Sequence, residues 1–181
     1  MLKRSCCLGL LLAVLFIAGF TTPSVAQDEN GQPLVFTEVQ DVSVDMQAYM
    51  EAYRQASAGE EVKGLRGMTP QYKYMAIVPS NIVYQSWNTS FNLLSYQGSG
   101  TTDRIFFAFY NRGVQYKMLS LSPIKGYTDY SLLVTALLHG TPFKNPSTIV
   151  VLSEKYLFSL NQFIFSDYGF SMQRFDPIKI Y

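Results

Sequence analysis

The fold is decided by residues 105–121, IFFAFY-NRG-VQYKMLSL, in which an aromatic run is followed by a short turn and a second apolar run. Aromatic and β-branched side chains favour strands. Gly113 stands at the end of the turn Asn111-Arg112-Gly113, where a tight hairpin needs a residue of left-handed conformation. The sequence therefore predicts a β-hairpin over 105–121, closed by Pro123 and Gly126.

Further strands are predicted on both sides of this hairpin. Upstream of it they cover 74–78, 82–87 and 91–96; downstream they cover 148–152, 157–165 and 170–175. Asp167-Tyr168-Gly169 predicts the turn between the last two. The triplet Gly98-Ser99-Gly100 is also interpreted as a turn, because a phosphate-binding glycine loop requires a helix after it and here a strand follows.

Two helices complete the expected elements. Apolar residues recur at helical spacing in 44–56, after Ser43 as a plausible N-cap, and we expect this stripe to pack on a sheet. The stripe consists of Met46, Tyr49, Met50 and Tyr53.

The second helix is predicted over 128–139, with Thr128 as its cap. Gly140 is its expected left-handed terminator and Pro142 lies two residues beyond. Its apolar face would consist of Leu132, Leu133, Ala136 and Leu137. Strands grouped around few helices predict an α+β fold, with a mostly antiparallel sheet and two main helices.

The N-terminus has the three parts of a secretory signal peptide. Lys3 and Arg4 precede the apolar residues 8–20, and Ser24-Val25-Ala26 offers small residues at the cleavage site. An apolar run of 13 residues is shorter than the roughly 20 that a membrane-spanning helix needs. We expect cleavage after Ala26, export to the periplasm or the exterior of a bacterial envelope, and no integral membrane span in the mature chain.

The mature chain divides into a flexible N-terminal segment, 27–42, and a single α+β domain, 43–181. Both cysteines, Cys6 and Cys7, lie in the predicted signal peptide, which excludes a disulfide scaffold and a thiolate metal site. The sequence predicts no cofactor, and the single histidine excludes a zinc site built from several.

Composition also limits the possible partners. The 14 basic and 13 acidic residues nearly balance and form no basic stripe, so no nucleic-acid partner is predicted. The 13 Tyr, 13 Phe and one Trp predict a β-rich aromatic core. Because aromatic residues concentrate at interfaces, an exposed patch of Tyr and Phe is the expected contact with a partner.

No residue is predicted to be catalytic. His139 would lie in the last turn of the second helix, where the helix dipole favours its charged form. This is a structural reason for a histidine at that position, without catalysis. The remaining candidates are carboxylates beside turn residues or charges, which is typical of solvated groups: Asp103, Glu154, Asp167 and Asp176. A secreted hydrolase using a pair of these stays an alternative.

A small outer-membrane β-barrel is the other alternative, because the chain ends in an aromatic residue, Ile178-Lys179-Ile180-Tyr181. Pro177 interrupts this last stretch, and two helices are hard to place in a small barrel.

One family is similar to the C-terminal part. Four segments resemble the GerMN domain of sporulation and germination proteins. They are the strand 105–110, the run Met118-Leu119-Ser120-Leu121-Ser122-Pro123, the helix end Ala136-Leu137-Leu138-His139-Gly140-Thr141-Pro142 and the closing hairpin around Asp167-Tyr168-Gly169. The resemblance covers about 104–176. It implies a small α+β module of the cell envelope that binds a partner or helps an assembly form, with no catalytic residues. The sequence thus predicts an exported, non-catalytic binding or assembly module for a protein or an envelope polymer.

Overall fold

The computed structural model describes residues 35–39, 46–62, 72–79, 81, 83, 86–96, 98, 101–141 and 145–180, without the side chains of residues 122 and 123. The predicted signal peptide 1–26 and most of the predicted segment 27–42 lie outside these residues, as do Pro142 and Tyr181.

The described residues form two antiparallel sheets and two helices. Across the larger sheet the strand order is β1 (Val35–Glu38), β5 (Val114–Lys125), β4 (Thr102–Asn111), β7 (Thr148–Ser153), β2 (Tyr74–Val78) and β10 (Ile178–Lys179). Across the smaller sheet it is β6 (Asp129–Leu133), β3 (Asn88–Ser95), β8 (Phe158–Ser166) and β9 (Gly169–Phe175). The helices are α2 (Met46–Ser57) and α3 (Val134–Leu137). The predicted antiparallel fold with two helices is confirmed, although the fold is mainly β.

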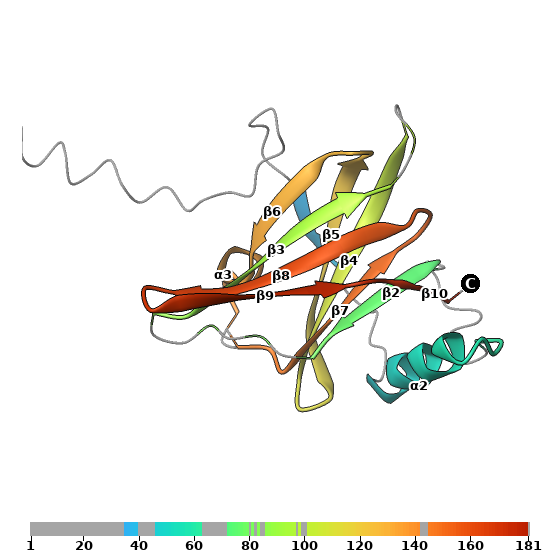
Figure 1. Cartoon of the computed structure of the whole chain (residues 1–181), viewed down its shortest axis with the longest axis horizontal. Helices are drawn as coiled ribbons and strands as arrows, with labels where there is room; N and C mark the ends of the chain where they lie inside the picture. The colour runs from blue at the N-terminus through green and yellow to red at the C-terminus, as the bar shows by residue number, and fades with distance from the viewer. Residues whose placement is uncertain are drawn as a thin grey trace, which may run out of the picture.

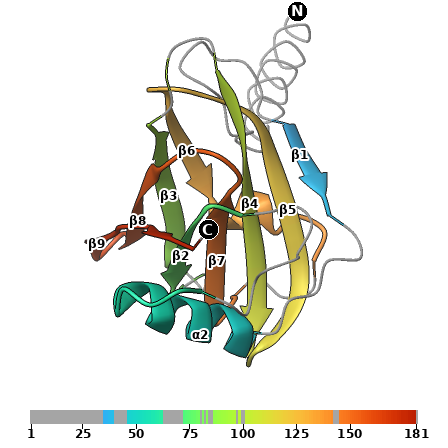
Figure 2. The same ribbon diagram turned by 90° about the vertical axis from the view of Figure 1, so that its right-hand side faces the viewer.

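The elements form three layers. The smaller sheet lies in front of the larger one in Figure 1, with its strands crossing those behind it. In Figure 2, α2 crosses in front of the larger sheet near its lower end. One apolar core fills the space between the sheets, and a second joins α2 to the other face of the larger sheet.

Strand β4 contributes to both cores, because successive side chains of a strand point to opposite faces. Phe107 faces the smaller sheet, where its ring lies 6.3 Å from that of Phe91. Tyr110 faces α2, where its ring meets that of Tyr49 edge-on at 6.3 Å. This explains why residues 105–110 read as one continuous apolar run rather than an alternating one.

The hairpin at 105–121 is confirmed, and its turn has the expected geometry. Arg112 and Gly113 have φ of 50° and 84°, the two left-handed residues of a type I′ turn. The prediction that Pro123 closes the hairpin is wrong, since β5 continues to Lys125. The β4–β5 pairing shifts register between Asp103 and Ile105, so Pro123 lies in a bulge, where the missing N–H interrupts no ladder.

Helix α2 is confirmed, but its predicted apolar stripe is only partly right. Tyr49 and Ala52 are fully buried against the larger sheet. Met50 and Tyr53 are 52% and 37% exposed, because they lie one position round the helix from the buried face.

The second predicted helix is largely wrong. Residues 129–133 form β6, which pairs with β3, and only 134–137 are helical. Tyr130 and Leu132 are buried while Asp129 and Ser131 are exposed, which is the alternation of a strand. Gly140 does have the predicted left-handed conformation, with φ of 79°. Of the predicted strand at 82–87, the described residues contribute a single bridge at Trp87.

The position of β4 between two cores predicts a large effect of truncating its rings. Phe107→Ala should lower the free energy of unfolding by about 3–5 kcal/mol, because it leaves a cavity between the sheets. Phe170→Ala, at an exposed site on β9, should change it by less than about 0.5 kcal/mol. Urea unfolding of both variants checks this, and equal losses would contradict the assignment of the core.

Candidate functional site

His139 lies in the exposed turn that follows α3. Its backbone carbonyl accepts a hydrogen bond from Lys117 Nζ at 3.2 Å. The predicted place of His139 in the last turn of a long helix is wrong, because α3 ends at Leu137.

The four candidate carboxylates do not converge on one cavity. Asp103 and Glu154 lie near each other at one end of β4 and β7, where Glu154 forms two hydrogen bonds with Arg104. Asp167 is exposed in the β8–β9 turn, and Asp176 is paired with Arg174 at 2.7 Å.

Asp103 is the one candidate with a buried carboxylate. Its Oδ1 accepts the N–H of Arg104 at 2.8 Å and its Oδ2 that of Tyr156 at 3.0 Å. Burial raises the pKa of this carboxyl above its usual range, and the charge of nearby Glu154 raises it further. Because backbone amides occupy both oxygens, the side chain fastens the β7–β8 loop and is not presented to a substrate.

An apolar patch lies elsewhere, on the outer face of the smaller sheet. We define the apolar patch as Phe163, Phe165, Phe170 and Met172. The β8–β9 pairing places Phe163 opposite Met172 and Phe165 opposite Phe170. Directly opposite side chains have Cβ atoms about 5 Å apart, so the four form one contiguous block. Phe170 is 77% and Met172 59% exposed.

The sequence of β8 explains why the patch faces outward. Phe158 and Leu160 point into the core between the sheets, and Gln162 on the same face donates a hydrogen bond to Asn81 at 3.0 Å. Phe163 and Phe165 have the opposite phase and therefore face away from the larger sheet. Beyond them the β8–β9 hairpin ends in a turn, in which Tyr168 is 88% exposed.

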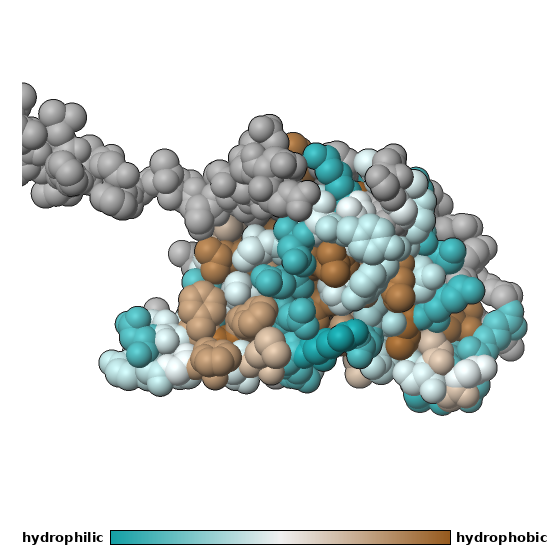
Figure 3. Space-filling view, turned by 45° about the horizontal axis from the view of Figure 1, so that its top comes forward, coloured by the Kyte–Doolittle hydropathy of each residue, from teal (hydrophilic) through white to brown (hydrophobic). Residues whose placement is uncertain are grey.

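A row of polar side chains crosses the same outer face next to the apolar patch. We define the polar row as Ser131, Asn92, Asn161 and Arg174, which oppose one another across β6, β3, β8 and β9. Figure 3 shows the two kinds of surface side by side, with tan and brown side chains gathered over the hairpin and a teal band beside them. This face therefore offers apolar contact and hydrogen bonding next to each other.

A groove of about 580 Å³ lies on the other side of β9, against α2. Its walls include Met50 and Tyr53 of the helix and Phe175 of β9. Of its described lining residues only Asp176 carries a carboxylate, and that group is paired with Arg174. The described lining of the groove therefore offers no carboxylate pair for hydrolysis.

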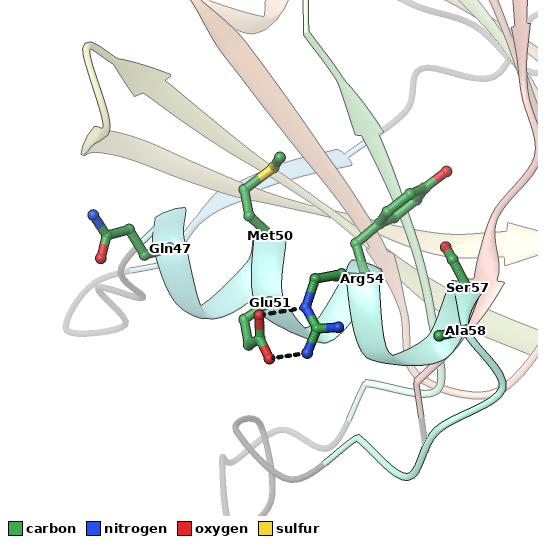
Figure 4. A pocket seen from close by; sticks show the side chains of 7 residues that line it. Gln47, Met50, Glu51, Arg54, Ser57 and Ala58 are labelled. Atoms are coloured by element: carbon green, nitrogen blue, oxygen red, sulfur yellow. Dashed lines mark hydrogen bonds and ion pairs between the residues drawn. The ribbon is translucent and has the colours of Figure 1, made fainter.

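The outward side of α2 carries a second, shallow depression. Figure 4 shows Arg54 bound to Glu51 through two contacts, while Met50 points away from this pair. The Arg54 guanidinium holds the pKa of the Glu51 carboxyl well below its usual range, at about 2. Such an exposed ion pair within one helix contributes little to stability. Because the Arg54 guanidinium is already paired, it is not available as a cation for a ligand.

The sequence predicted an exposed patch of Tyr and Phe but not its members. The signal for them lies in the alternation of β8. Phe158 and Leu160 occupy even-numbered positions on one face of the strand, whereas Phe163 and Phe165 occupy odd-numbered positions on the other. It becomes readable only once the covered face of the strand is known.

Comparison with known proteins gives no match, either to a protein family, to a curated protein or to a solved structure. The resemblance of residues 104–176 to the GerMN domain stays a prediction. No helix in the described ranges combines the length and apolar composition needed to cross a membrane. Those ranges also hold no cluster of three or more His, Cys, Asp or Glu suited to a metal ion.

The structural interpretation of Asp103 predicts a stability effect. Asp103→Ala leaves the partly buried N–H groups of Arg104 and Tyr156 without their acceptor and should lower the free energy of unfolding by about 1–3 kcal/mol. Asp167→Ala, in the exposed turn, should stay within about 0.5 kcal/mol of the wild type. Urea unfolding measures both, and an Asp103→Ala variant as stable as the wild type would reopen the catalytic interpretation of this carboxylate.

Proposed function

We propose that this chain is an exported, non-catalytic protein of a bacterial envelope that acts as a binding or assembly module. Its partner is a protein or an envelope polymer, and its contact surface is the apolar patch of the β8–β9 hairpin. Export rests on residues 1–26, which have the charge, apolar run and cleavage site of a signal peptide.

The observation that carries the binding role is the exposure of the apolar patch. Exposing Phe170 and Met172 forgoes about 1.5–3 kcal/mol for each side chain that burial would supply. Contiguous apolar patches of this kind on a folded protein mark interaction sites. No described element covers this one, and Figure 3 shows the patch open to solvent.

The placement of the titratable groups supports a role without catalysis. Asp103 has both oxygens bound by backbone amides, and Glu154 is held by Arg104. His139 stands in an exposed turn away from either group. None of the three residues lines either of the two depressions beside α2.

Export is tested by expressing the full chain in a bacterial host and sequencing the N-terminus of the mature protein. We expect it to begin at Gln27 and to fractionate outside the cytoplasm. A protein that keeps Met1 and stays in the cytoplasm would contradict the proposal.

The contact surface is tested by cross-linking the mature protein in its native envelope. The double variant Phe170→Ser and Met172→Ser should lose most cross-links, because it removes apolar contact area at exposed positions without touching the core. The control is Tyr127→Asn, which removes an aromatic ring that is 66% exposed outside the patch. Asparagine tolerates the φ of 56° at that position, so the control should fold. If the double variant kept every cross-link of the wild type, the patch would not be the contact surface.

A further inference from the structure

The outer face of the smaller sheet is a platform with an apolar half and a hydrogen-bonding half. Within the apolar patch, Phe163 and Phe165 are two residues apart on β8, about 7 Å along the strand. Phe170 and Met172 flank them on β9. The apolar half is therefore two strands wide and two side chains long, and it lies on the regular part of a sheet rather than on a loop.

The hydrogen-bonding half begins one pair further along the same strands. Asn161 is the outward-facing residue just before Phe163 on β8, and it lies opposite Asn92 of β3. An asparagine side chain offers two donors and one acceptor oxygen. No hydrogen bond within the described part of the chain occupies the amides of Asn92 and Asn161. Ser90 of β3, opposite Phe163, brings a hydroxyl to the border between the halves.

The platform carries almost no net charge. Arg174 is its one cation among the described residues, and Asp176 pairs with it at 2.7 Å. Asp129 lies on the far corner of the face, one pair beyond the polar row. Nucleic acids and anionic membranes are bound through clusters of Lys and Arg, which the described part of this face lacks. Charge complementarity therefore favours an uncharged ligand.

The ligand must also be apolar on one side and rich in both donors and acceptors on its rim. A pyranose ring has this chemistry, since its C–H face is apolar and its equatorial hydroxyls each donate and accept. Stacked on Phe163 or Phe170, a sugar would direct its hydroxyls toward the amides of the polar row. We propose that the platform binds an uncharged glycan, with the apolar patch stacking against sugar rings and Asn92 and Asn161 bonding their hydroxyls.

A second copy of the chain fits the platform less well. A stable protein interface buries about 800 Å² on each partner. The apolar patch supplies only part of that area, and the rest of the face consists of amides and hydroxyls that need matched partners when buried. A glycan supplies those partners with its own hydroxyls.

The inference rests on the proposed function and names its ligand class, so the experiment separates the two. Calorimetric titration of the mature protein, residues 27–181, uses cellohexaose and chitohexaose as uncharged probes. We expect binding of at least one of them. Its affinity should be unchanged between about 50 mM and about 500 mM salt, because no charge pairs form.

Paired variants locate the site. Phe170→Ala and Asn161→Ala should each weaken binding by about tenfold or more. Gln173→Ala, on the opposite face of β9, and Tyr127→Asn, outside the patch, should bind as the wild type does. Binding that none of the variants weakens would overturn the assignment to the platform.

Two further measurements test whether a phospholipid membrane or a second copy of the chain binds the platform instead. If neither hexasaccharide binds while the protein sediments with neutral or anionic phospholipid vesicles, the face is a membrane surface and the inference fails. If the wild type is a dimer that Phe170→Ser dissociates, the face joins two copies and the inference fails again. If cross-links to the patch persist while neither hexasaccharide binds, the proposed function survives without the glycan.

Discussion

The structure depends on β4, whose two faces are both buried. Its odd-numbered residues pack against the smaller sheet and its even-numbered residues pack beneath α2. A strand with both faces covered cannot alternate in polarity, so the run IFFAFY carries the information for two cores at once. The neighbours β5 and β7 pair with it on either side and extend both cores.

This arrangement determines which surfaces stay open. The larger sheet packs against α2 on one face and against the smaller sheet on the other. The outer face of the smaller sheet is therefore the one that no described element covers. Phe158 and Leu160 anchor β8 in the core. The same strand continues beyond the core, where Phe163 and Phe165 point outward. Its neighbour β9 is the edge strand of the smaller sheet. The platform is thus a consequence of a two-layered core that ends before the hairpin does.

Local patterns predicted the parts of the fold that local physics decides. The hairpin at 105–121 was predictable because its aromatic run and its glycine-containing turn agree with each other. The strand at 129–133 was not, because Asp-Tyr-Ser-Leu-Leu reads as the start of a helix until Tyr130 and Leu132 are seen to face the same core. The members of the apolar patch were also hidden, since the exposed face of β8 depends on which sheet covers it. The prediction that Met50 and Tyr53 belong to the buried stripe was wrong for a similar reason. A shift of one position on α2 separates a buried side chain from an exposed one.

Hydrogen exchange of the backbone amides tests the central role of β4 most directly. Because β4 is paired on both sides and covered on both faces, its amides should exchange only through global unfolding. Amides of the hairpin tip, 166–172, should exchange faster by orders of magnitude through local opening. Equal protection of β4 and the hairpin tip would contradict the account. The same holds for β4 amides that exchange before those of the edge strand β9.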